Sequence, residues 1–156
     1  MNTLENSVVC INKRISYDYL IKSRYEAGVV LEGWEVKSTK CGNIQISGSY
    51  IIMSDLNLWV IGSHISAMSS VCTHGIILEN RKRKLLMRKK ELKKLDDILK
   101  YTNCTLVPYK VYTKNNIIKL EICLCIGKKK YDKRLELKNF EWNTEKNRKI
   151  RSIIKS

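Results

Sequence analysis

Residues 118–134 read IKLEICLCIGKKKYDKR, an alternating segment that runs directly into a cluster of positive charge. An alternation with a period of two is typical of a β-strand that buries one face. The glycine at position 127 ends this pattern, so we expect the cationic cluster to emerge from the rim of a β-sheet. Such a placement suits a polyanionic partner.

The chain stays basic beyond this cluster. Residues 128–156 hold 11 Lys and Arg against 4 Asp and Glu, a net charge of +7, with only scattered apolar residues. A segment of this composition cannot bury enough apolar surface to fold well alone. We therefore expect residues 128–156 to form a basic tail, disordered when free and helical on an RNA surface.

The whole chain carries 30 Lys and Arg against 15 Asp and Glu, a net charge of +15 in 156 residues. Such a field is usually the footprint of nucleic acid or another anionic surface. A hydrophobic content of 44% predicts one domain with a real core. The sequence lacks an apolar run of about 18 residues and a signal-peptide pattern, so we expect a cytoplasmic protein that does not engage membranes.

The six cysteines are widely spaced, and their only close pair is a C-x-C at positions 123 and 125. Structural zinc sites usually need C-x-x-C pairs. Cys72 and His74 could supply two ligands, but this spacing is a weak metal signal. We expect reduced thiols that pack as small hydrophobes, with no metal and no cofactor.

The first part of the chain gives mixed signals. Residues 1–11 show no periodicity and are predicted to form a flexible leader. Residues 15–31 alternate and predict a long strand interrupted at Gly28, because glycine inside a strand often marks a bulge. Residues 34–40 fit either a short helix or a further strand.

Two hairpins are clearer. One joins residues 49–53 to residues 56–61, and the other joins residues 105–112 to residues 117–126. Pro108 lacks a backbone donor, so its strand is expected to lie at a sheet edge at that point.

Between the hairpins, the sequence predicts a loop over residues 63–80 and then a helix. The basic stretch 81–90 leads into apolar residues at helical spacing, and the helix should end near Asn103. These elements predict a mainly β fold with helices. The best match is an OB-like closed antiparallel β-barrel over residues 12–127, with short flanking helices and the basic tail.

The motifs, taken together, resemble those of one family, the SsrA-binding proteins (small protein B). The similarity runs from Asn12 to about Trp142, in the expected order. The most recognisable block is YEAGVVLEGWEVKS at residues 25–38. The matching shorter motifs are NKR (12–14), SY (49–50), HIS (64–66), RKRKLL (81–86), TLVP (105–108) and GKKKYDKR (127–134).

This resemblance implies a function. Members of the family bind the tRNA-like domain of transfer-messenger RNA and deliver it to stalled ribosomes, where the basic tail probes the empty mRNA channel near the decoding centre of the small subunit. The chemistry then belongs to the ribosome and to alanyl-tRNA synthetase, with elongation factor Tu as an indirect partner. The resemblance therefore implies a monomeric RNA-binding adaptor that is not an enzyme.

The resemblance also assigns residues. Glu26 would accept hydrogen bonds from base or ribose donors, Lys84 would neutralise phosphate, Leu86 could equally belong to the core, and His74 could stack on a base. The full expected RNA-binding set is Asn12, Lys13, Arg14, Glu26, Gly28, Lys37, His74, Arg81, Arg83, Lys84, Leu86 and Arg88. The expected ribosome-binding tail residues are Lys128, Lys129, Lys130, Tyr131, Asp132, Lys133 and Arg134.

Two other functions stay open from the residues alone. A generic OB-type single-strand binder or ribosome-associated protein would use aromatic residues along the sheet face, for which Tyr17, Tyr19, Tyr50 and Tyr109 could serve. A nuclease would need a base, a metal site or an activated nucleophile. The histidines lack paired carboxylates nearby in sequence, which disfavours that reading.

Overall fold

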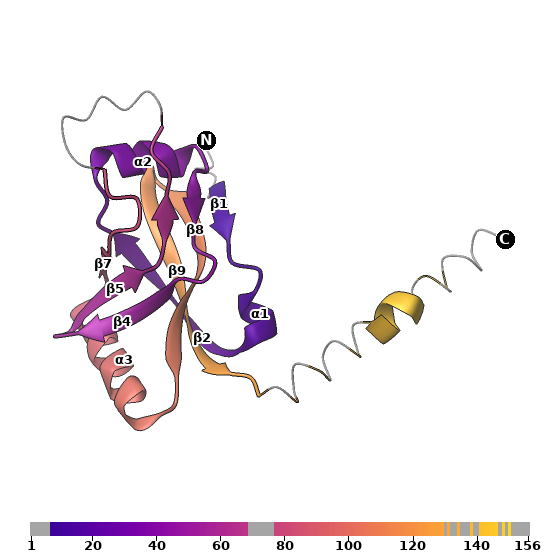
Figure 1. Cartoon of the computed structure of the whole chain (residues 1–156). Coiled ribbons are helices and arrows are strands. Elements are labelled where there is room, and N and C mark those ends of the chain that lie inside the picture. The colour runs from indigo at the N-terminus through magenta and orange to yellow at the C-terminus, as the bar shows by residue number, and fades with distance from the viewer. Residues whose placement is uncertain are drawn as a thin grey trace, which may run out of the picture.

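The computed structural model describes residues 7–68 and 77–129, together with residues 131, 134, 138, 141–146, 148 and 150 of the tail. More of the described residues lie in antiparallel strands than in helices (Figure 1). The main sheet contains β1 (Ser7–Ile11), β2 (Tyr19–Val29), β4 (Tyr50–Ser54), β5 (Asn57–Ile61), β7 (Arg83–Leu86), β8 (Thr105–Lys114) and β9 (Ile117–Gly127). A two-stranded sheet pairs β3 (Ile44–Gln45) with β6 (His64–Ile65). The predicted mainly β class is confirmed.

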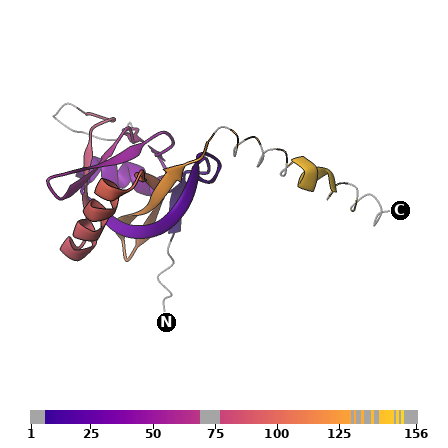
Figure 2. The same cartoon turned by 90° about the horizontal axis from the view of Figure 1, so that it is seen from below.

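Three helices accompany the strands in the part of the chain before the tail. They are α1 (Ile15–Asp18), α2 (Gly33–Lys40) and α3 (Lys89–Tyr101). Figures 1 and 2 show α3 on the side of the sheet away from the tail, while α2 crosses the other end of the strands. The predicted helix after the basic stretch is α3, and residues 34–40, left open between helix and strand, belong to α2.

The strand pairings return to their starting point. The order is β1-β8-β4-β5-β7-β2-β9, and β9 also pairs with β8. Each strand in the series β8, β4, β5, β7, β2 and β9 therefore pairs with the next, and the last, β9, pairs with the first, β8. The strand β1 adds to this circuit by pairing with β8 from Ser7 opposite Thr113 to Ile11 opposite Lys110.

Both predicted hairpins are present, and each closes through two residues with positive φ. Asp55 and Leu56 have φ of 50° and 56° between β4 and β5, and Asn115 and Asn116 have φ of 50° and 62° between β8 and β9. Two left-handed residues match the right-handed twist of the flanking strands. Asn adopts this conformation readily, whereas Leu56 does so at a steric cost.

The core lies inside the circuit of strands. Burial alternates along β5 and β7, whereas β8 and β9 bury runs of consecutive residues, and α3 adds Leu95, which is fully buried. A smaller cluster lies on the other side of β9, where Ile15 of α1 packs with Val107, Cys123 and Cys125. The five cysteines among the described residues are free, and these two are buried. The expectation of small hydrophobic thiols is thus confirmed for Cys123 and Cys125.

Several local predictions are wrong at the first strands. The expected leader extends to residue 11, but Ser7–Ile11 form β1 because β8 offers them a partner 100 or so residues away in sequence. Residues Ile15–Asp18 form α1 rather than the start of a strand. The irregularity in β2 lies between Ile21 and Ser23 and not at Gly28.

The basic stretch 81–90, for which the sequence predicted no element of its own, contains a strand, β7, whose burial alternates although Arg83 is one of its inward residues. Pro108 of β8 has a recorded pairing only with Ile122 of β9, because the ladder of β1 begins at Lys110 and the recorded pairing with β4 is at Leu106. The strand is therefore an edge at that point, as expected. The proline therefore lies between two short ladders, beside an irregularity in the register, where its missing donor is tolerated.

From Tyr131 onward the described tail residues are helical, including the run 141–146, which lies away from the sheet in both views (Figures 1 and 2). Tyr131 and Trp142 are exposed. No helix among the described residues is long and apolar enough to cross a membrane.

Candidate nucleic-acid interface

An open recess on the outside of the sheet brings together four of the predicted RNA-binding residues. Glu26 and Gly28 lie in β2, Leu86 is the last residue of β7, and Arg88 directly precedes α3. The other residues lining this Glu26 recess are Met87, Glu91 and Lys119. A concave surface with an apolar side chain, two acids and two bases can contact both the bases and the backbone of a nucleic acid.

Strand pairing places these residues side by side. Gly28 lies opposite Leu86 on one side and opposite Lys119 on the other. A Cβ atom at Gly28 would lie 3.5 Å from the Cβ of Leu86, so the missing side chain of glycine leaves space in the recess beside Leu86. Leu86 is 55% exposed, although the sequence left it open as a core residue. An exposed apolar side chain in a recess is suited to contact with a base or ribose.

Glu26 is held by three neighbours. The Tyr112 hydroxyl donates a hydrogen bond to its carboxylate, and the Nζ atoms of Lys114 and Lys119 lie 3.5 and 3.4 Å from its oxygens. The hydrogen bond from Tyr112 is the main cause that lowers the pKa of Glu26, with Lys114 and Lys119 adding to it. Glu26 is therefore an ionised acceptor that still exposes 40% of its side chain.

The phenol of Tyr112 remains a donor. Burial and the hydrogen bond to Glu26 raise the pKa of Tyr112 well above its usual range. Tyr112 is buried, so its hydroxyl holds the Glu26 carboxylate from the protein side. The rest of the carboxylate faces solvent. An acid placed in a basic surface favours ligands with hydrogen-bond donors over plain phosphate.

The sequence did not point to Lys119, Met87 or Glu91 as recess residues. Lys119 occupies an outward position in the alternation of β9, and this could have marked it as exposed. Its neighbours across the strands could not be read from the sequence, because β2 lies about 90 residues earlier in the chain. Glu91 lies in the first turn of α3, where it is one of several charged residues.

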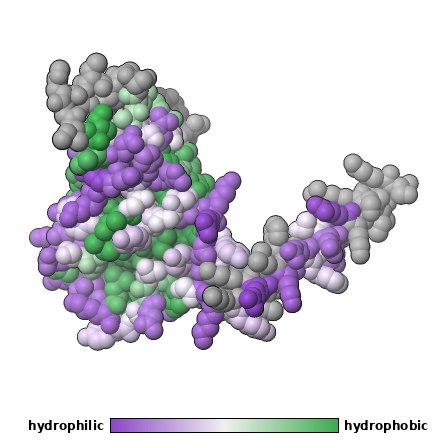
Figure 3. Space-filling view, in the orientation of Figure 1, coloured by the Kyte–Doolittle hydropathy of each residue, from purple (hydrophilic) through white to green (hydrophobic). Residues whose placement is uncertain are grey.

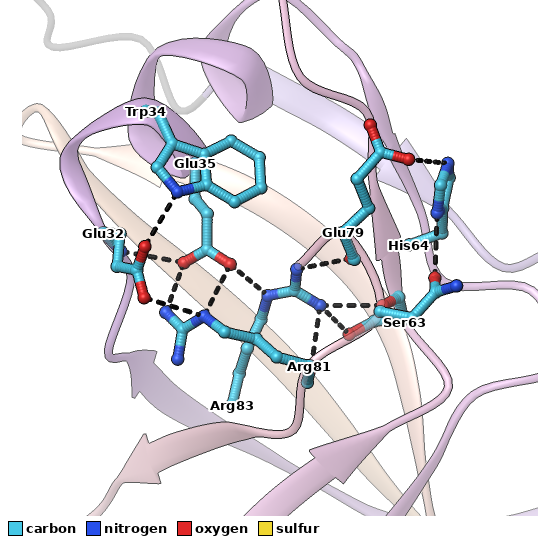
Figure 4. A network of polar contacts seen from close by, with 9 residues as sticks. Glu32, Trp34, Glu35, Ser63, His64, Glu79, Arg81 and Arg83 are labelled. Carbon is cyan, nitrogen blue, oxygen red and sulfur yellow. Dashed lines mark hydrogen bonds and ion pairs between the residues drawn. The ribbon is translucent and has the colours of Figure 1, made fainter. Parts of the chain in front are cut away.

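Arg83 is not available as a surface RNA contact. It is 1% exposed, and its guanidinium donates to Glu35 Oε1 (2.9 Å), Ser63 O (2.7 Å), Ser63 Oγ (2.8 Å), Glu79 O (2.8 Å) and Arg81 O (3.2 Å) (Figure 4). The structure buries this predicted contact residue and uses all of its recorded hydrogen bonds within the protein, so its RNA contact stays a prediction. Burial lowers the pKa of Arg83, and the Glu35 carboxylate opposes that effect.

Arg81 and Glu35 belong to the same network. Arg81 donates from Nε and Nη2 to the two oxygens of Glu35 at 3.0 and 2.5 Å, and its Nε also lies 3.3 Å from Glu32. Glu35 is fully buried and caps α2, since its carboxylate accepts the backbone N–H of Glu32 at 2.8 Å. Arg81 thus joins α2 to the segment before β7, and only part of its side chain stays open to solvent.

Burial acts to raise the pKa of the Glu35 carboxyl, but the hydrogen bonds from Arg81, the Glu32 backbone and Arg83 leave it below the usual range. Lys37, predicted to bind RNA, is exposed on α2 and does not line the Glu26 recess. The structure therefore separates the YEAGVVLEGWEVKS block into a part at Glu26 that lines the recess and a structural part at Glu35.

The NKR motif lies in another place. Asn12 is 4% exposed; its Nδ2 donates to the Pro108 carbonyl (3.3 Å), and its Oδ1 accepts the Arg14 N–H (3.2 Å). Asn12 and Arg14 line a second recess with Ser49 and Tyr50. Lys13 and Arg14 are exposed, but neither lines the Glu26 recess. The buried side chain of Asn12 joins β1 to β8 and is a poor direct contact.

Some of the predicted residues have no described position. These are His74 of the RNA-binding set and Lys130, Asp132 and Lys133 of the tail, which lie outside the described residues. Lys129, Tyr131 and Arg134 are exposed.

Lys128 has a structural role at the start of the tail. Its Nζ donates to the Ser16 carbonyl (2.7 Å), and its backbone N–H donates to the Asp18 carbonyl (3.0 Å). This lysine fastens the start of the tail to α1.

Lys84, the remaining predicted contact, lies on the outward face of β7 with its Nζ 6.0 Å from the ring centre of Trp59. Among the described residues, no group of three or more His, Cys, Asp and Glu side chains is arranged to hold a metal ion.

Comparisons with known proteins agree with this geometry. The family described as SmpB protein matches residues 9–152. The chain belongs to the SmpB family. The SsrA-binding protein of Coxiella burnetii is 40% identical over 144 residues, 92% of this chain and 91% of the relative. That of Ralstonia nicotianae is 43% identical over 140 residues, 90% and 95% of the two chains.

A solved structure is also similar. Its description reads "tmRNA-SmpB: a journey to the center of the bacterial ribosome", and its matching chain is 34% identical, with a TM-score of 0.63 over 78% of this chain and 85% of that chain. This SmpB neighbour matches the mainly β fold with helices found here.

Proposed function

We propose that the chain is the RNA-binding adaptor of trans-translation in its host. It binds the tRNA-like domain of transfer-messenger RNA and delivers that RNA to stalled ribosomes for rescue and peptide tagging. Family membership, the SsrA-binding relatives and the likeness to an SmpB chain on the ribosome support this role. The adaptor works in the cytoplasm as a monomer, is not an enzyme, and meets elongation factor Tu and alanyl-tRNA synthetase through the RNA.

The Glu26 recess is the observation that carries the RNA-binding proposal. It combines an ionised acceptor, an exposed Leu86 and the cations Arg88 and Lys119 on one concave surface. A tRNA-like fold offers base and ribose donors as well as phosphates, so it can satisfy all of these groups at once. A plain single strand carries the same groups but does not hold them in fixed positions, so it should engage the cations equally well and gain less from Glu26.

We further infer that residues 12–127 form an OB-like closed barrel, to which β1 adds from residue 7. The circuit of ladders through β8, β4, β5, β7, β2 and β9 supports this inference. OB-type barrels bind oligonucleotides on their outer strands, and the Glu26 recess lies on such a surface.

Residues 128–156 act in this proposal as the ribosome-binding tail, which probes the empty mRNA channel beside the decoding centre. The net charge of +7 suits ribosomal RNA. Exposed Tyr131 can stack on a base, and Arg134 can pair with phosphate. Lys128 contributes by holding the tail to α1.

A competition gel shift tests the RNA proposal. Labelled tRNA-like domain is bound at physiological salt and challenged with excess unlabelled domain, unstructured RNA and ordinary tRNA. We expect the tRNA-like domain to compete far better than the unstructured RNA. Equal competition by every RNA would instead favour a generic OB-type binder, the alternative that the basic charge also allows.

Truncation after Lys129 tests the tail separately, because it keeps both Lys128 bonds to α1. We expect binding to the tRNA-like domain to persist and tagging of stalled chains to be lost. Tagging at the full-length level by the truncated chain would refute the tail proposal.

A further inference from the structure

The outward face of β4, β5 and β7 carries an aromatic side chain between apolar and basic neighbours. Strand register places Ile52 opposite Trp59, and Trp59 opposite Lys84. Ile52 and Tyr50 are 39% and 49% exposed on β4. Figure 3 shows hydrophobic areas over β4 and β5 with hydrophilic side chains on their borders.

Two lysines lie over the Trp59 ring. Their Nζ atoms are 5.5 Å (Lys82) and 6.0 Å (Lys84) from the ring centre, within the range of a cation–π contact. Lys82 is exposed and Trp59 is half-buried, so part of the ring is open to solvent beside the two ammonium groups. The lysines can swing from the ring to a phosphate, because each has a long flexible stem.

The outward face of β4, β5 and β7 carries positive charge and no acidic side chain. The outward residues of the three strands are Tyr50, Ile52, Ser54, Asn57, Trp59, Ile61, Lys84 and Leu86, none of which is acidic. Asp55, the acid nearest in sequence, lies in the turn at the tip of the hairpin. An aromatic plane with flanking cations and without carboxylates matches a nucleobase and its phosphates better than it matches an acidic peptide, whose side chains offer no plane to stack.

This face continues into the Glu26 recess. Lys84 and Leu86 are alternate residues of β7 and point outward together, about 7 Å apart along the strand. The Val30 N–H donates to the Lys84 carbonyl at 2.9 Å, so β2 borders both surfaces. A nucleic acid seated at Leu86 can therefore reach Lys84 and Trp59 within one or two nucleotides.

We propose that Trp59, Lys82 and Lys84 form a stacking site for an unpaired nucleotide of the bound RNA. One base lies against Trp59, and the lysines pair with its flanking phosphates. This inference rests on the proposed function, because it extends the RNA-binding surface from the Glu26 recess to the outer face of β5.

Tryptophan fluorescence tests the stacking directly. In a Trp142→Phe background, the remaining tryptophans are Trp59 and Trp34, which is 7% exposed. Titration with the tRNA-like domain should quench the emission, and the quenching should disappear when Trp59→Phe is added. Quenching that survives Trp59→Phe would overturn the proposal.

Affinity gives a second test with a matched control. Trp59→Leu should weaken binding about tenfold, and Trp59→Phe should lose much less, because phenylalanine keeps a ring to stack on. Lys82→Gln with Lys84→Gln should reduce the slope of log affinity against log salt by about 1.4, from two lost phosphate contacts. Lys93→Gln with Lys94→Gln removes the same charge from exposed positions on α3 and should leave the slope nearly unchanged.

The outcomes separate the two proposals. If Glu26→Arg weakens binding while Trp59→Leu and the Lys82/Lys84 pair do not, the stacking site is wrong and the adaptor function stands. If every RNA competes equally but Trp59 is quenched by all of them, the stacking site stands and the specificity for the tRNA-like domain is wrong. Quenching by an acidic peptide and not by RNA would overturn the stacking site in favour of a protein partner.

Discussion

Glu35 and Glu26 each contact two basic side chains and one further hydrogen-bond donor, yet Glu35 is sealed inside the protein and Glu26 stays accessible to a ligand. Glu35 is fully buried and receives Arg81, Arg83 and a backbone N–H. Glu26 is 40% exposed and receives Lys114, Lys119 and the Tyr112 hydroxyl. Arginine holds a carboxylate through a fixed fork of donors, whereas lysine does so as a mobile point charge. The first arrangement fixes α2 to β7, and the second leaves an acceptor that a ligand can share.

The largest effect is expected from Glu35→Gln. The substitution leaves Arg83 charged and buried without its carboxylate, and breaking a buried ion pair typically costs about 3 kcal/mol or more. We expect the free energy of unfolding, measured by urea denaturation, to fall by about 3 kcal/mol. A loss below about 1 kcal/mol would show that the arginines find other partners.

Glu32→Gln is the matched control for this prediction. Glu32 also pairs with Arg81, but its side chain is 55% exposed and solvent screens the pair. Its carboxylate also accepts the Trp34 Nε1–H, which a glutamine oxygen can still accept. We expect a loss of at most about 1 kcal/mol.

Acid should reduce the contrast between the native chain and Glu35→Gln. The pKa of Glu35 is lower in the folded chain than its ordinary value of 4.5. The stability from its ionisation is therefore complete above the unfolded-state pKa and is lost as pH falls through the folded-state pKa. Melting temperatures measured from neutral pH to about pH 3 should converge for the two proteins. A constant difference across this range would contradict the role of the Glu35 charge.

Glu26→Arg should act more on RNA binding than on folding. It removes the acceptor in the recess and places a cation beside Lys114 and Lys119, so we expect affinity for the tRNA-like domain to fall about tenfold. Urea denaturation should show a loss of about 1 kcal/mol, because the substitution also removes the hydrogen bond from Tyr112. Asp97→Arg, the same charge change at an exposed position of α3, serves as the control. Equal affinity of the native chain and Glu26→Arg would remove Glu26 from the interface.

Tyr112→Phe should have the smallest effect. It deletes the hydrogen bond that contributes most to lowering the pKa of Glu26. We expect that pKa to rise toward its usual value, which an NMR titration of the carboxyl carbon can follow. Stability should fall by about 1 kcal/mol, the usual net contribution of one hydrogen bond. If the pKa of Glu26 does not move, the two lysines alone hold the carboxylate.

Sequence periodicity was sufficient for elements in which apolar residues recur at regular spacing. The hairpin of β8 and β9 and the helix α3 were predicted because Leu120, Ile122 and Leu95 fall at regular spacing among polar residues. It failed for β7, where the inward Arg83 reads as a surface cation. Its carboxylate partner, Glu35, lies 48 residues away, and no local pattern reveals such a pair.

The same limit applies to the candidate site. Glu26, Leu86 and Arg88 were assigned by resemblance, and the structure places all three in one recess. Lys119 and Tyr112 were not assigned, because their contact with Glu26 depends on the register of strands that are distant in sequence. Arg83 and Lys84 are neighbours in one basic run, and only their places on opposite faces of β7 separate a buried structural residue from a half-buried one that faces outward.

The two bonds of Lys128 to the carbonyls of α1 fix the point at which the basic tail begins. Ile15 anchors α1 in the small cluster with Val107, Cys123 and Cys125. The buried side chains of this cluster therefore hold the starting point of the tail in place relative to the strands, although none of them belongs to the tail.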